Sequence, residues 1–323
     1  MESGNRKNHS HPKPLVAICI PVYNGEKYII EALESINSQT YTNYECHIIN
    51  NASNDKTKEL VEQFIENKKR FRLHDHKDFV DLVTNWNRTV DYIPAKARYF
   101  KVVQADDVLF PDSVETHVEL MESYPNAGIA SSYRMIGTYV YGYGIDYFKG
   151  SCQNGKDVLF NHLNGNAEIT GSVTQLFFRI SQLKKVPGYP EIFNPDDFHV
   201  DTRLAYEMFL ISDLAFAFRI LNFTRRHDDA ATITTVEKLN TSIHARESSL
   251  YRFKEIFPEL ENRYLDVRRN YSYFLLKSHL KNRKEILEWH NRHLKRKFRL
   301  SEYLAGAFWK NRFGERLAKL TGR

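Results

Sequence analysis

The chain has 323 residues, of which 42% are hydrophobic, so it is long enough to bury one large core together with an appendage. Its apolar runs fall short of the roughly 18 residues that a membrane-spanning helix needs, which excludes such a helix. Cys19, Cys46 and Cys152 have no metal-binding spacing and cannot all pair, which favours a reducing cytoplasm. Residues 1–13 are polar, lack the apolar centre of a signal peptide and are predicted to be disordered.

The first part of the chain alternates between strand-like and helix-like patterns. Residues 15–23 (LVAICIPVY) form the continuous apolar run of a strand that is buried on both faces. Helical spacing follows in residues 26–39, then a short strand in 46–50 and a second helix in 56–66. This order predicts a βαβ unit with a right-handed crossover. Neither helix begins with the glycine motif of a dinucleotide-binding or P-loop site, which disfavours those enzyme classes.

Residues 101–113 (KVVQADDVLFPDS) carry the most informative motif. An apolar, strand-like run leads to two adjacent carboxylates, Asp106 and Asp107, and a helix is predicted to begin after the proline. Divalent cations prefer carboxylate oxygens and often bind a substrate phosphate at the same time. Ligands of parallel α/β proteins bind outside the carboxyl ends of the strands. The motif therefore predicts either a metal site at that edge or a solvated Asp-Asp turn that caps a helix.

The middle of the chain continues the alternation. Residues 128–148 indicate a strand and then a Tyr/Gly-rich loop, residues 156–163 a short helix and residues 171–180 another strand. The aromatic residues of the loop have two open interpretations, because they could stack on a sugar ring or pack on the core. They are Tyr139, Tyr141 and Tyr143.

Reactive side chains flank the last predicted helix–strand pair. An apolar stripe predicts a helix that begins near Asp201, so this carboxylate lies at or just before a helix N-terminus. It can act as a general base or only cap the helix, and Asp196 and Asp197 are rivals for the first role. The following strand, LAFAFRILNFT, ends at the triplet Arg-Arg-His of residues 225–227. The planar fork of an arginine matches the oxygens of a diphosphate.

The C-terminal part of the chain is strongly basic. Residues 277–323 hold 14 Lys/Arg against 4 Asp/Glu, a net charge of +10. One face of a predicted helix there carries Trp309, Phe313, Leu317 and Leu320. Such a basic amphipathic helix suits an anionic membrane surface, and the same pattern also fits a helix packed on the preceding domain. No nucleic-acid-binding motif accompanies the charge, so nucleic acid is not an expected partner.

Four segments of the sequence resemble the family 2 glycosyltransferases of the GT-A fold. They are PVYNGEKYIIEALESINSQTYTNYECHIINNASNDKT, QADDVLFPDS, HVDTRLAYEMFL and RRHDDAAT. The family pattern has a strand ending in P-x-Y/F-N, an acidic motif after the second strand, a D-x-D-type metal motif, a later acidic base and a nearby His. The resemblance implies an α/β fold with a mostly parallel sheet flanked by helices. It implies a GT-A domain over residues 14–237 and a basic helical region over residues 238–323.

The resemblance also implies roles for individual residues. Asp106 and His227 correspond to ligands of Mg²⁺ or Mn²⁺, and Asp201 corresponds to the catalytic base. The residues implied in donor binding are Pro21, Tyr23, Asn51, Asn87, Gln104, Asp107 and Arg226. Such an enzyme would move one sugar, with inversion, from a nucleotide-sugar donor to a hydroxyl group of a glycan or lipid-linked acceptor. The first candidate donor is a UDP-sugar.

Two positions depart from the family pattern and keep an alternative open. Asn50 and Asn51 stand where relatives carry acidic residues, and Gln104 replaces the first acid of the metal motif. An amide can donate as well as accept, so the chain could also be a non-catalytic nucleotide-sugar-binding homologue or a scaffold in polysaccharide assembly. The loop PVYNGEKY is not the Gly-rich basic loop of a sugar-phosphate nucleotidyltransferase, and the sequence lacks the Q-x-x-R-W motif of processive synthases. The expected location is the cytoplasm, either free or peripheral on the inner face of the membrane.

Overall fold

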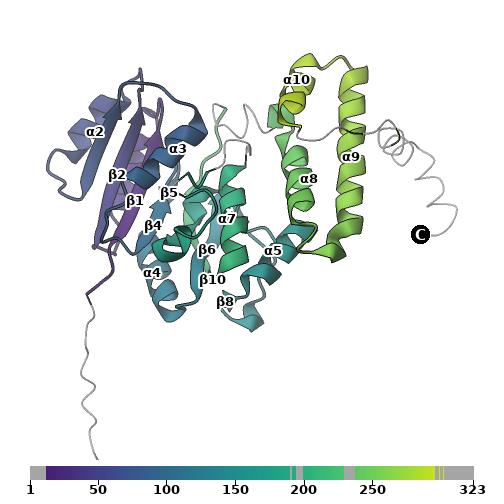
Figure 1. Ribbon diagram of the computed structural model, residues 1–323. Helices are drawn as coiled ribbons and strands as arrows, with labels where there is room; N and C mark the ends of the chain where they lie inside the picture. The colour runs from purple at the N-terminus through teal and green to yellow at the C-terminus, as the bar shows by residue number, and fades with distance from the viewer. Residues whose placement is uncertain are drawn as a thin grey trace, which may run out of the picture.

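The computed structural model describes residues 12–189, 191–193, 199–228 and 237–294, together with residues 298 and 301 (Figure 1). The predicted disordered segment lies outside these residues except for its last two positions. The apolar face of the predicted basic helix, which begins at Trp309, lies wholly outside them. Within the described ranges, no helix combines the length and the apolar character that crossing a bilayer requires.

One mixed sheet of ten strands forms the centre of the described structure, in the order β3-β2-β1-β4-β9-β6-β10-β5, with β7 beside β6 and β8 beside β10. The strands are β1 (Val16–Val22), β2 (Tyr44–Asn51), β3 (Phe71–His76), β4 (Tyr99–Val102), β5 (Val108–Leu109), β6 (Ala127–Ile136), β7 (Tyr139–Tyr141), β8 (Cys152–Gln153), β9 (Phe177–Arg179) and β10 (Asp213–Thr224). The long ladders, β2 with β3, β1 with β2, β1 with β4 and β6 with β10, are parallel. The antiparallel ladders have at most three paired residues. The predicted α/β class with a mostly parallel sheet is confirmed.

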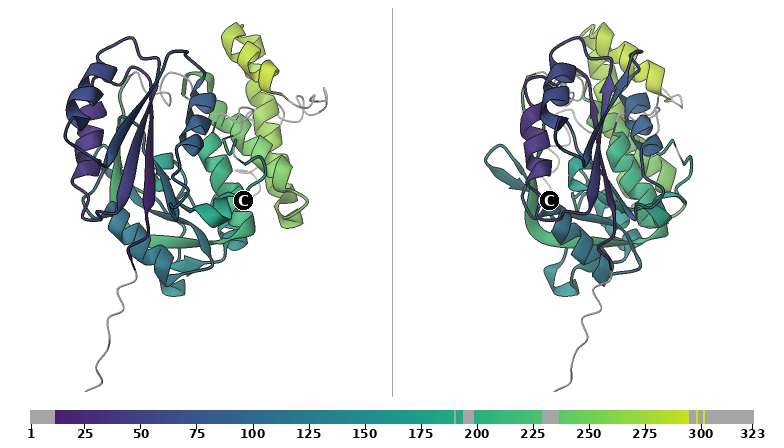
Figure 2. Two further views of the ribbon diagram at one scale, coloured as in Figure 1. Left: turned by 60° about the vertical axis from the view of Figure 1, so that its left-hand side comes forward. Right: turned by 90° about the vertical axis from the view of Figure 1, so that its left-hand side faces the viewer.

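Helices cover both faces of this sheet (Figure 2). They are α1 (Ile29–Asn37), α2 (Thr57–Ile65), α3 (Leu82–Asp91), α4 (Ser113–Ser123), α5 (Gly155–Asn164), α6 (Ile180–Leu183), α7 (Val200–Ile211), α8 (Thr241–Phe253), α9 (Glu261–Leu280) and α10 (Lys284–His293). Helices α1, α2 and α4 share one core with the sheet, and α3, α5 and α7 share the other. Helix α8 stands beside α5 and α7, α9 packs on α8, and α10 packs on α9, all far from β2 and β3 (Figure 1).

Strand β1 shows why the first apolar run has no polar positions. All seven of its residues are buried. Val16 and Ile18 belong to the core under α1, whereas Ala17 and Cys19 belong to the opposite core. Successive side chains of a strand point to opposite faces, so a strand covered on both sides needs an apolar residue at every position.

The predicted strand over residues 171–180 is only partly present. Val173–Gln175 form a 3₁₀ turn, β9 has three residues, and α6 begins at Ile180. The hydroxyl group of Ser172 accepts a hydrogen bond from the backbone N–H of Thr174, which favours the turn over an extended chain. The apolar pattern of this segment does not reveal that local competition.

The described C-terminal helices are part of the packed structure. Helices α8 and α9 contribute Leu250, Phe253 and Tyr264 to the core that α5 and α7 share. In α10, His290 is fully buried, and its Nδ1 and Nε2 lie 2.8 Å from the Tyr271 hydroxyl and 2.9 Å from the Leu239 carbonyl oxygen. Helices α8 and α9 therefore pack on the core of α5 and α7, whereas α10 packs on α9 and Leu239.

Candidate active site

Three parallel strands end side by side at one edge of the sheet. In the ladders of β1, Val22 is paired with Asn50 of β2 and Cys19 with Val102 of β4, so the segments after all three strands meet at this edge. Pro21 is buried within β1 and shapes the backbone there. The polar residues that the sequence singles out at positions 51, 104 and 106 follow or end these strands, where a parallel sheet binds its ligands.

Asn51 fixes the loop that follows β3. Its Nδ2 donates to the Val80 carbonyl oxygen at 2.7 Å, and its Oδ1 accepts from the Val80 N–H at 3.0 Å and from Arg88 Nη1 at 3.1 Å. The adjacent Asn50 donates to Asp75 Oδ1 at 2.8 Å. An amide can satisfy a backbone donor and acceptor together, which a carboxylate cannot. Asn51, which stands where the family pattern has an acidic residue, therefore stabilises this loop through both backbone groups of Val80.

The loop brings an aromatic ring beside Tyr23. The ring centroids of Tyr23 and Phe79 lie 4.7 Å apart, and the two residues are 46% and 60% exposed. Phe79 directly precedes Val80, so Asn51 holds this pair in place. The two exposed rings are inclined at 57° to each other, and each offers an apolar face on which a planar group can stack.

Asp106 and His227 form the chemical centre of the edge. Asp106 follows β4, and His227 follows β10. Their Oδ2 and Nε2 atoms lie 2.9 Å apart. Within the described residues, the buried Nδ1 of His227 has no hydrogen-bond partner. Tyr28, at the start of α1, packs against the imidazole with ring centroids 4.9 Å apart.

The Asp106–His227 pair fits a divalent cation. An octahedral Mg²⁺ ion bound at about 2.1 Å places neighbouring ligand atoms about 3 Å apart, close to the separation of Oδ2 and Nε2. One carboxylate and one imidazole leave the other positions for water and phosphate oxygens, which Mg²⁺ and Mn²⁺ accept. No group of three or more acidic, His or Cys side chains suited to a metal occurs among the described residues. The donor set therefore suits an ion that arrives with a phosphate ligand.

Arg225 belongs to this centre, and sequence reasoning missed it in favour of Arg226. The Nε of Arg225 donates to the Asp106 carbonyl oxygen at 3.0 Å, its Nη2 donates to Glu31 Oε2 at 2.5 Å, and its guanidinium lies 4.6 Å from the Tyr28 ring centroid. Arg226 is directed away and pairs with Glu237 at 2.6 Å. In an extended segment, residues i and i+2 share a face. The position of His227 could therefore have identified Arg225.

Asp107 is a buried support for Arg225. It is 1% exposed, and its Oδ1 accepts from the Arg225 N–H at 3.1 Å while its Oδ2 accepts from Ser172 Oγ at 3.3 Å. Burial and the adjacent charge of Asp106 raise the pKa of Asp107 to about 7. Both carboxylate oxygens are used inside the protein, so the side chain fixes the segment after β10.

Two other predicted donor residues have contacts inside the protein. Asn87 forms paired hydrogen bonds of 2.8 Å with the backbone N–H and carbonyl group of Phe193, and so ties α3 to the segment before α7. Gln104 is half-buried, and its backbone N–H donates to Thr174 Oγ1 at 3.0 Å. This hydrogen bond fixes the backbone between the end of β4 and Asp106.

Asp201 lies in the first turn of α7. It is half-buried, and its Oδ1 accepts from the N–H of Thr202 at 2.8 Å. Burial raises the pKa of Asp201 above its usual range, while the charges of His199 and Arg134 oppose the shift. Its sequence rivals, Asp196 and Asp197, lie outside the described residues. The raised pKa makes the Asp201 carboxylate a stronger proton acceptor.

Arg134 connects the two sides of the site. This buried guanidinium of β6 donates from Nη1 to the Gly171 carbonyl oxygen at 2.6 Å and lies 5.0 Å from the Tyr141 ring centroid. Burial lowers the pKa of Arg134, while the charges of Glu168, Asp107 and Asp201 raise it. One buried cation thus acts on both Asp107 and Asp201. Tyr139 at the start of β7 and Tyr143 just after this strand are 76% and 51% exposed, so these two rings do not pack on the core.

The sequence matches a known family over about half of its length. Residues 17–174 match the model described as Glycosyl transferase family 2. A relative described as an uncharacterized glycosyltransferase from Haemophilus influenzae is 32% identical over 120 residues, which cover 37% of this chain and 36% of that protein. The match thus spans about a third of that relative.

Solved structures share the fold over most of the chain. Staphylococcus aureus TarS 1–349 in complex with UDP-GlcNAc has a TM-score of 0.56 and 13% identity, with coverage of 88% of this chain and 94% of that one. The mannosyltransferase PcManGT from Pyrobaculum calidifontis, in complex with GDP-Man and Mn²⁺, has a TM-score of 0.54 and 14% identity. The aligned region covers 92% of this chain and 87% of the mannosyltransferase chain. At these identities the likeness establishes the fold.

Proposed function

Since the chain belongs to glycosyltransferase family 2, we propose that it moves one sugar from a nucleotide-sugar donor to a hydroxyl group of an acceptor. The observation that carries this proposal is the contact of 2.9 Å between Asp106 and His227 at the carboxyl edge of β4, beside Arg225. Nucleotide sugars are named with both structural neighbours, as UDP-GlcNAc and as GDP-Man. A UDP-sugar is the first candidate donor here.

Asp106 Oδ2 and His227 Nε2 would hold a Mg²⁺ or Mn²⁺ ion together with the donor diphosphate. The ion would neutralise the negative charge that develops on the departing nucleoside diphosphate. Arg225 supplies a fixed positive charge at the same place, because Asp107 and the Asp106 carbonyl oxygen orient it. Tyr23 and Phe79 offer stacking surfaces for the nucleobase.

Asp201 would accept the proton of the acceptor hydroxyl group. That oxygen forms a bond to the anomeric carbon of the donor while the bond from this carbon to the diphosphate oxygen breaks. The proton goes to the Asp201 carboxylate, and the nucleoside diphosphate leaves with the electron pair. A single displacement from the opposite face inverts the anomeric configuration. Burial, which raises the pKa of Asp201, favours this transfer.

A panel of nucleotide sugars tests the proposed donor class. Each compound is added to the full-length protein with Mn²⁺ or Mg²⁺, and the melting temperature and the release of nucleoside diphosphate are measured. A ligand present at 100 times its Kd adds about 2.7 kcal/mol of stability. Stabilisation by at least one nucleotide sugar, together with metal-dependent hydrolysis, is the expected result. Binding without any turnover, with or without an acceptor, would favour the non-catalytic homologue.

The Asp106→Asn variant tests the metal role. The substitution keeps the size of the side chain but removes the charge that would hold the ion, so turnover should fall on the order of 10²–10³-fold. Asp266→Asn is the matched control, because Asp266 lies on the exposed surface of α9, where it pairs with Arg269. Undiminished turnover in Asp106→Asn, or full activity of the unmodified protein in excess chelator, would contradict the role of the metal.

A further inference from the structure

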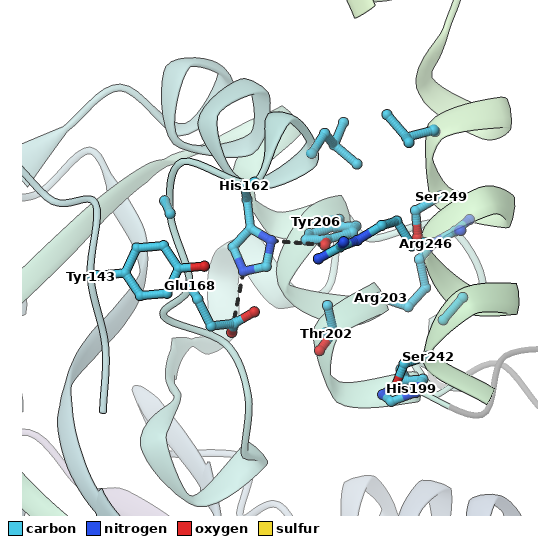
Figure 3. A pocket seen from close by; sticks show the side chains of 15 residues that line it. Tyr143, His162, Glu168, His199, Thr202, Arg203, Tyr206, Ser242, Arg246 and Ser249 are labelled. Atoms are coloured by element: carbon cyan, nitrogen blue, oxygen red, sulfur yellow. Dashed lines mark hydrogen bonds and ion pairs between the residues drawn. The ribbon is translucent and has the colours of Figure 1, made fainter. Parts of the chain in front are cut away.

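A cavity of about 230 Å³ lies between α5, α7 and α8 (Figure 3). Tyr143, Glu168, Thr202 and Arg246 are among the residues that line it. Thr202 directly follows Asp201, so the cavity begins one residue from the proposed base. Its volume is below the roughly 300–1,000 Å³ of pockets that enclose drug-sized ligands. The space therefore suits one saccharide or polyol unit.

One wall of the cavity is a pre-ordered polar network. His162 Nδ1 lies 2.9 Å from the Tyr206 hydroxyl group, and His162 Nε2 lies 3.1 Å from Thr170 Oγ1 and 3.4 Å from Glu168 Oε1. Burial alone would raise the pKa of Glu168, but the hydrogen bond and charge of His162 and the charge of Arg134 hold it below its usual range. The negative charge of this wall is therefore already balanced inside the protein.

The opposite wall, formed by α8, carries the positive charge of Arg246, whose side chain is partly open to solvent. Ser242, Arg246 and Ser249 follow helical spacing and line the same cavity. Figure 3 shows the Arg246 side chain reaching across the cavity toward Tyr206. Among the residues that the structure describes, Arg246 has no ion-pair partner. The other arginine of the cavity, Arg203, contacts Glu207 at 2.9 Å.

We propose that this cavity is the acceptor subsite, and that it takes an acceptor unit bearing an oxyanion, either a phosphate or a carboxylate. The guanidinium of Arg246 matches such a group with two parallel N–H donors, and the flanking serine hydroxyl groups add further donors. The neighbouring Asp201 would receive the proton of a hydroxyl group on the same unit. The inference rests on the proposed transfer reaction and adds the chemical class of the acceptor.

The test uses the full-length protein saturated with UDP and Mn²⁺, so that the donor site is occupied. Glucose 6-phosphate, glucuronate and uncharged glucose are titrated into it, and binding is measured by calorimetry and ligand-detected NMR. Both anionic sugars, or one of them, should bind more tightly than glucose, and the stronger of the two identifies the oxyanion. Arg246→Gln should weaken binding of the anionic sugar about tenfold, as expected for one charge-assisted hydrogen bond.

Two further variants separate location from general charge. Arg269→Gln removes an equal charge from exposed α9, outside the cavity, and should leave binding unchanged. Ala245→Phe fills the cavity from α8 without changing charge, and should weaken binding of all three sugars. Equal affinity for glucose and the anionic sugars, unchanged binding in Arg246→Gln, or no binding at all would overturn the proposal. If UDP binds but the sugars do not behave as expected, the acceptor inference alone has failed. If neither UDP nor any sugar binds, the proposed function has failed.

Discussion

The carboxylates of Asp107 and Asp201 differ in burial, and this difference separates their roles. Asp107 is fully enclosed, with both oxygens bound to other groups of the chain. Asp201 is half-buried, and one of its oxygens accepts from a backbone N–H. A general base must reach the proton that it removes. Asp201 is therefore the proposed base, and Asp107 is proposed to position Arg225.

Asp201→Asn should reduce sugar transfer about 10²–10⁴-fold, which is the usual contribution of general-base catalysis. The amide keeps the size of the side chain but cannot accept the proton. Binding of UDP with Mn²⁺ should stay unchanged, because the proposed donor contacts lie after β1, β3, β4 and β10. Single-turnover transfer and UDP titration measure the two effects. A loss of transfer below tenfold would direct attention to Asp196 or Asp197.

Gly171→Ala should displace the buried Arg134 guanidinium. A Cβ atom at this position would lie 2.3 Å from Arg134 Nη2 and 3.1 Å from Cζ. Overpacking of this kind costs about 1–3 kcal/mol, more than the roughly 0.4–1 kcal/mol that alanine gains by restricting the unfolded chain. Urea denaturation should therefore show a lower free energy of unfolding, together with slower transfer. An unchanged or higher free energy would mean that the guanidinium moves without cost.

The sequence singled out residues that the structure brings to one edge of the sheet, but it did not indicate which partners they contact inside the protein. It singled out Asp106, His227 and Asp201 from motifs. It chose Arg226, although Arg225 contacts the Asp106 carbonyl oxygen. It assigned Asn51 to the donor, although that side chain binds the Val80 backbone. Such tasks depend on partners that are remote in the sequence. Of these residues, only Arg225 could have been identified locally, from its spacing of two residues from His227.

At the scale of secondary structure, the β2–β3 edge contains a histidine cluster. His47 Nδ1 lies 2.9 Å from His74 Nε2, and the His74 ring stacks on Tyr92 with centroids 3.7 Å apart. The Tyr92 hydroxyl group lies 3.1 Å from His76 Nε2. Burial, followed by the charges of His47 and His76, lowers the pKa of His74 to about 4.

This cluster should make the protein sensitive to acid. Because the pKa of His74 is lower in the folded than in the unfolded protein, its contribution to stability is complete above about pH 6.5. The contribution is lost as the pH falls toward 4, since the unfolded chain then binds the proton first. His74→Phe keeps the stacking and should reduce the drop in unfolding free energy between pH 7 and pH 5. His279→Phe is an exposed control at the end of α9 and should leave this drop unchanged. An equal drop in the unmodified protein and in both variants would contradict this account.

The predicted helices and strands agree with the structure where the pattern of buried apolar residues alone determines the secondary structure. The predicted strand over residues 15–23 is β1, and the predicted helix over residues 56–66 is α2, each within one residue at either end. Their apolar runs follow a single period. The prediction of a continuous strand over residues 171–180 was wrong, because the side chain of Ser172 starts a turn within an apolar run. The cavity at α8 had no sequence signal, because its walls come from three separate helices and from the segments that contain Tyr143 and Glu168.

For the molecule as a whole, the basic tail remains the basis of a membrane prediction. Residues 295–323 hold 9 Lys/Arg against 2 Asp/Glu, a net charge of +7. Each basic residue near an anionic surface contributes about 1 kcal/mol, and salt weakens the attraction. A variant that ends at Leu294 keeps α10 and its contact with Leu239. It should lose binding to anionic vesicles in a sedimentation assay at low salt while it keeps donor hydrolysis.

The controls for the tail follow from its charge. Neutral vesicles should bind neither the full-length nor the shortened protein, and higher salt should release the full-length protein. If the full-length protein does not bind anionic vesicles at low salt, the membrane role is wrong. The tail would then be a packing or oligomerisation element, and the catalytic proposal would be unaffected.

The contact of Asp106 with His227 joins residues that are 121 positions apart. The first three parallel strands are complete by residue 76, but the proposed metal pair requires β10, which is among the last strands to be synthesised. A nascent chain would therefore acquire the proposed donor site only after the second half of the sheet has formed. Hydrogen exchange should then show that UDP with Mn²⁺ slows opening of β10 more than that of β2, because β10, unlike β2, leads into a proposed ligand of the ion.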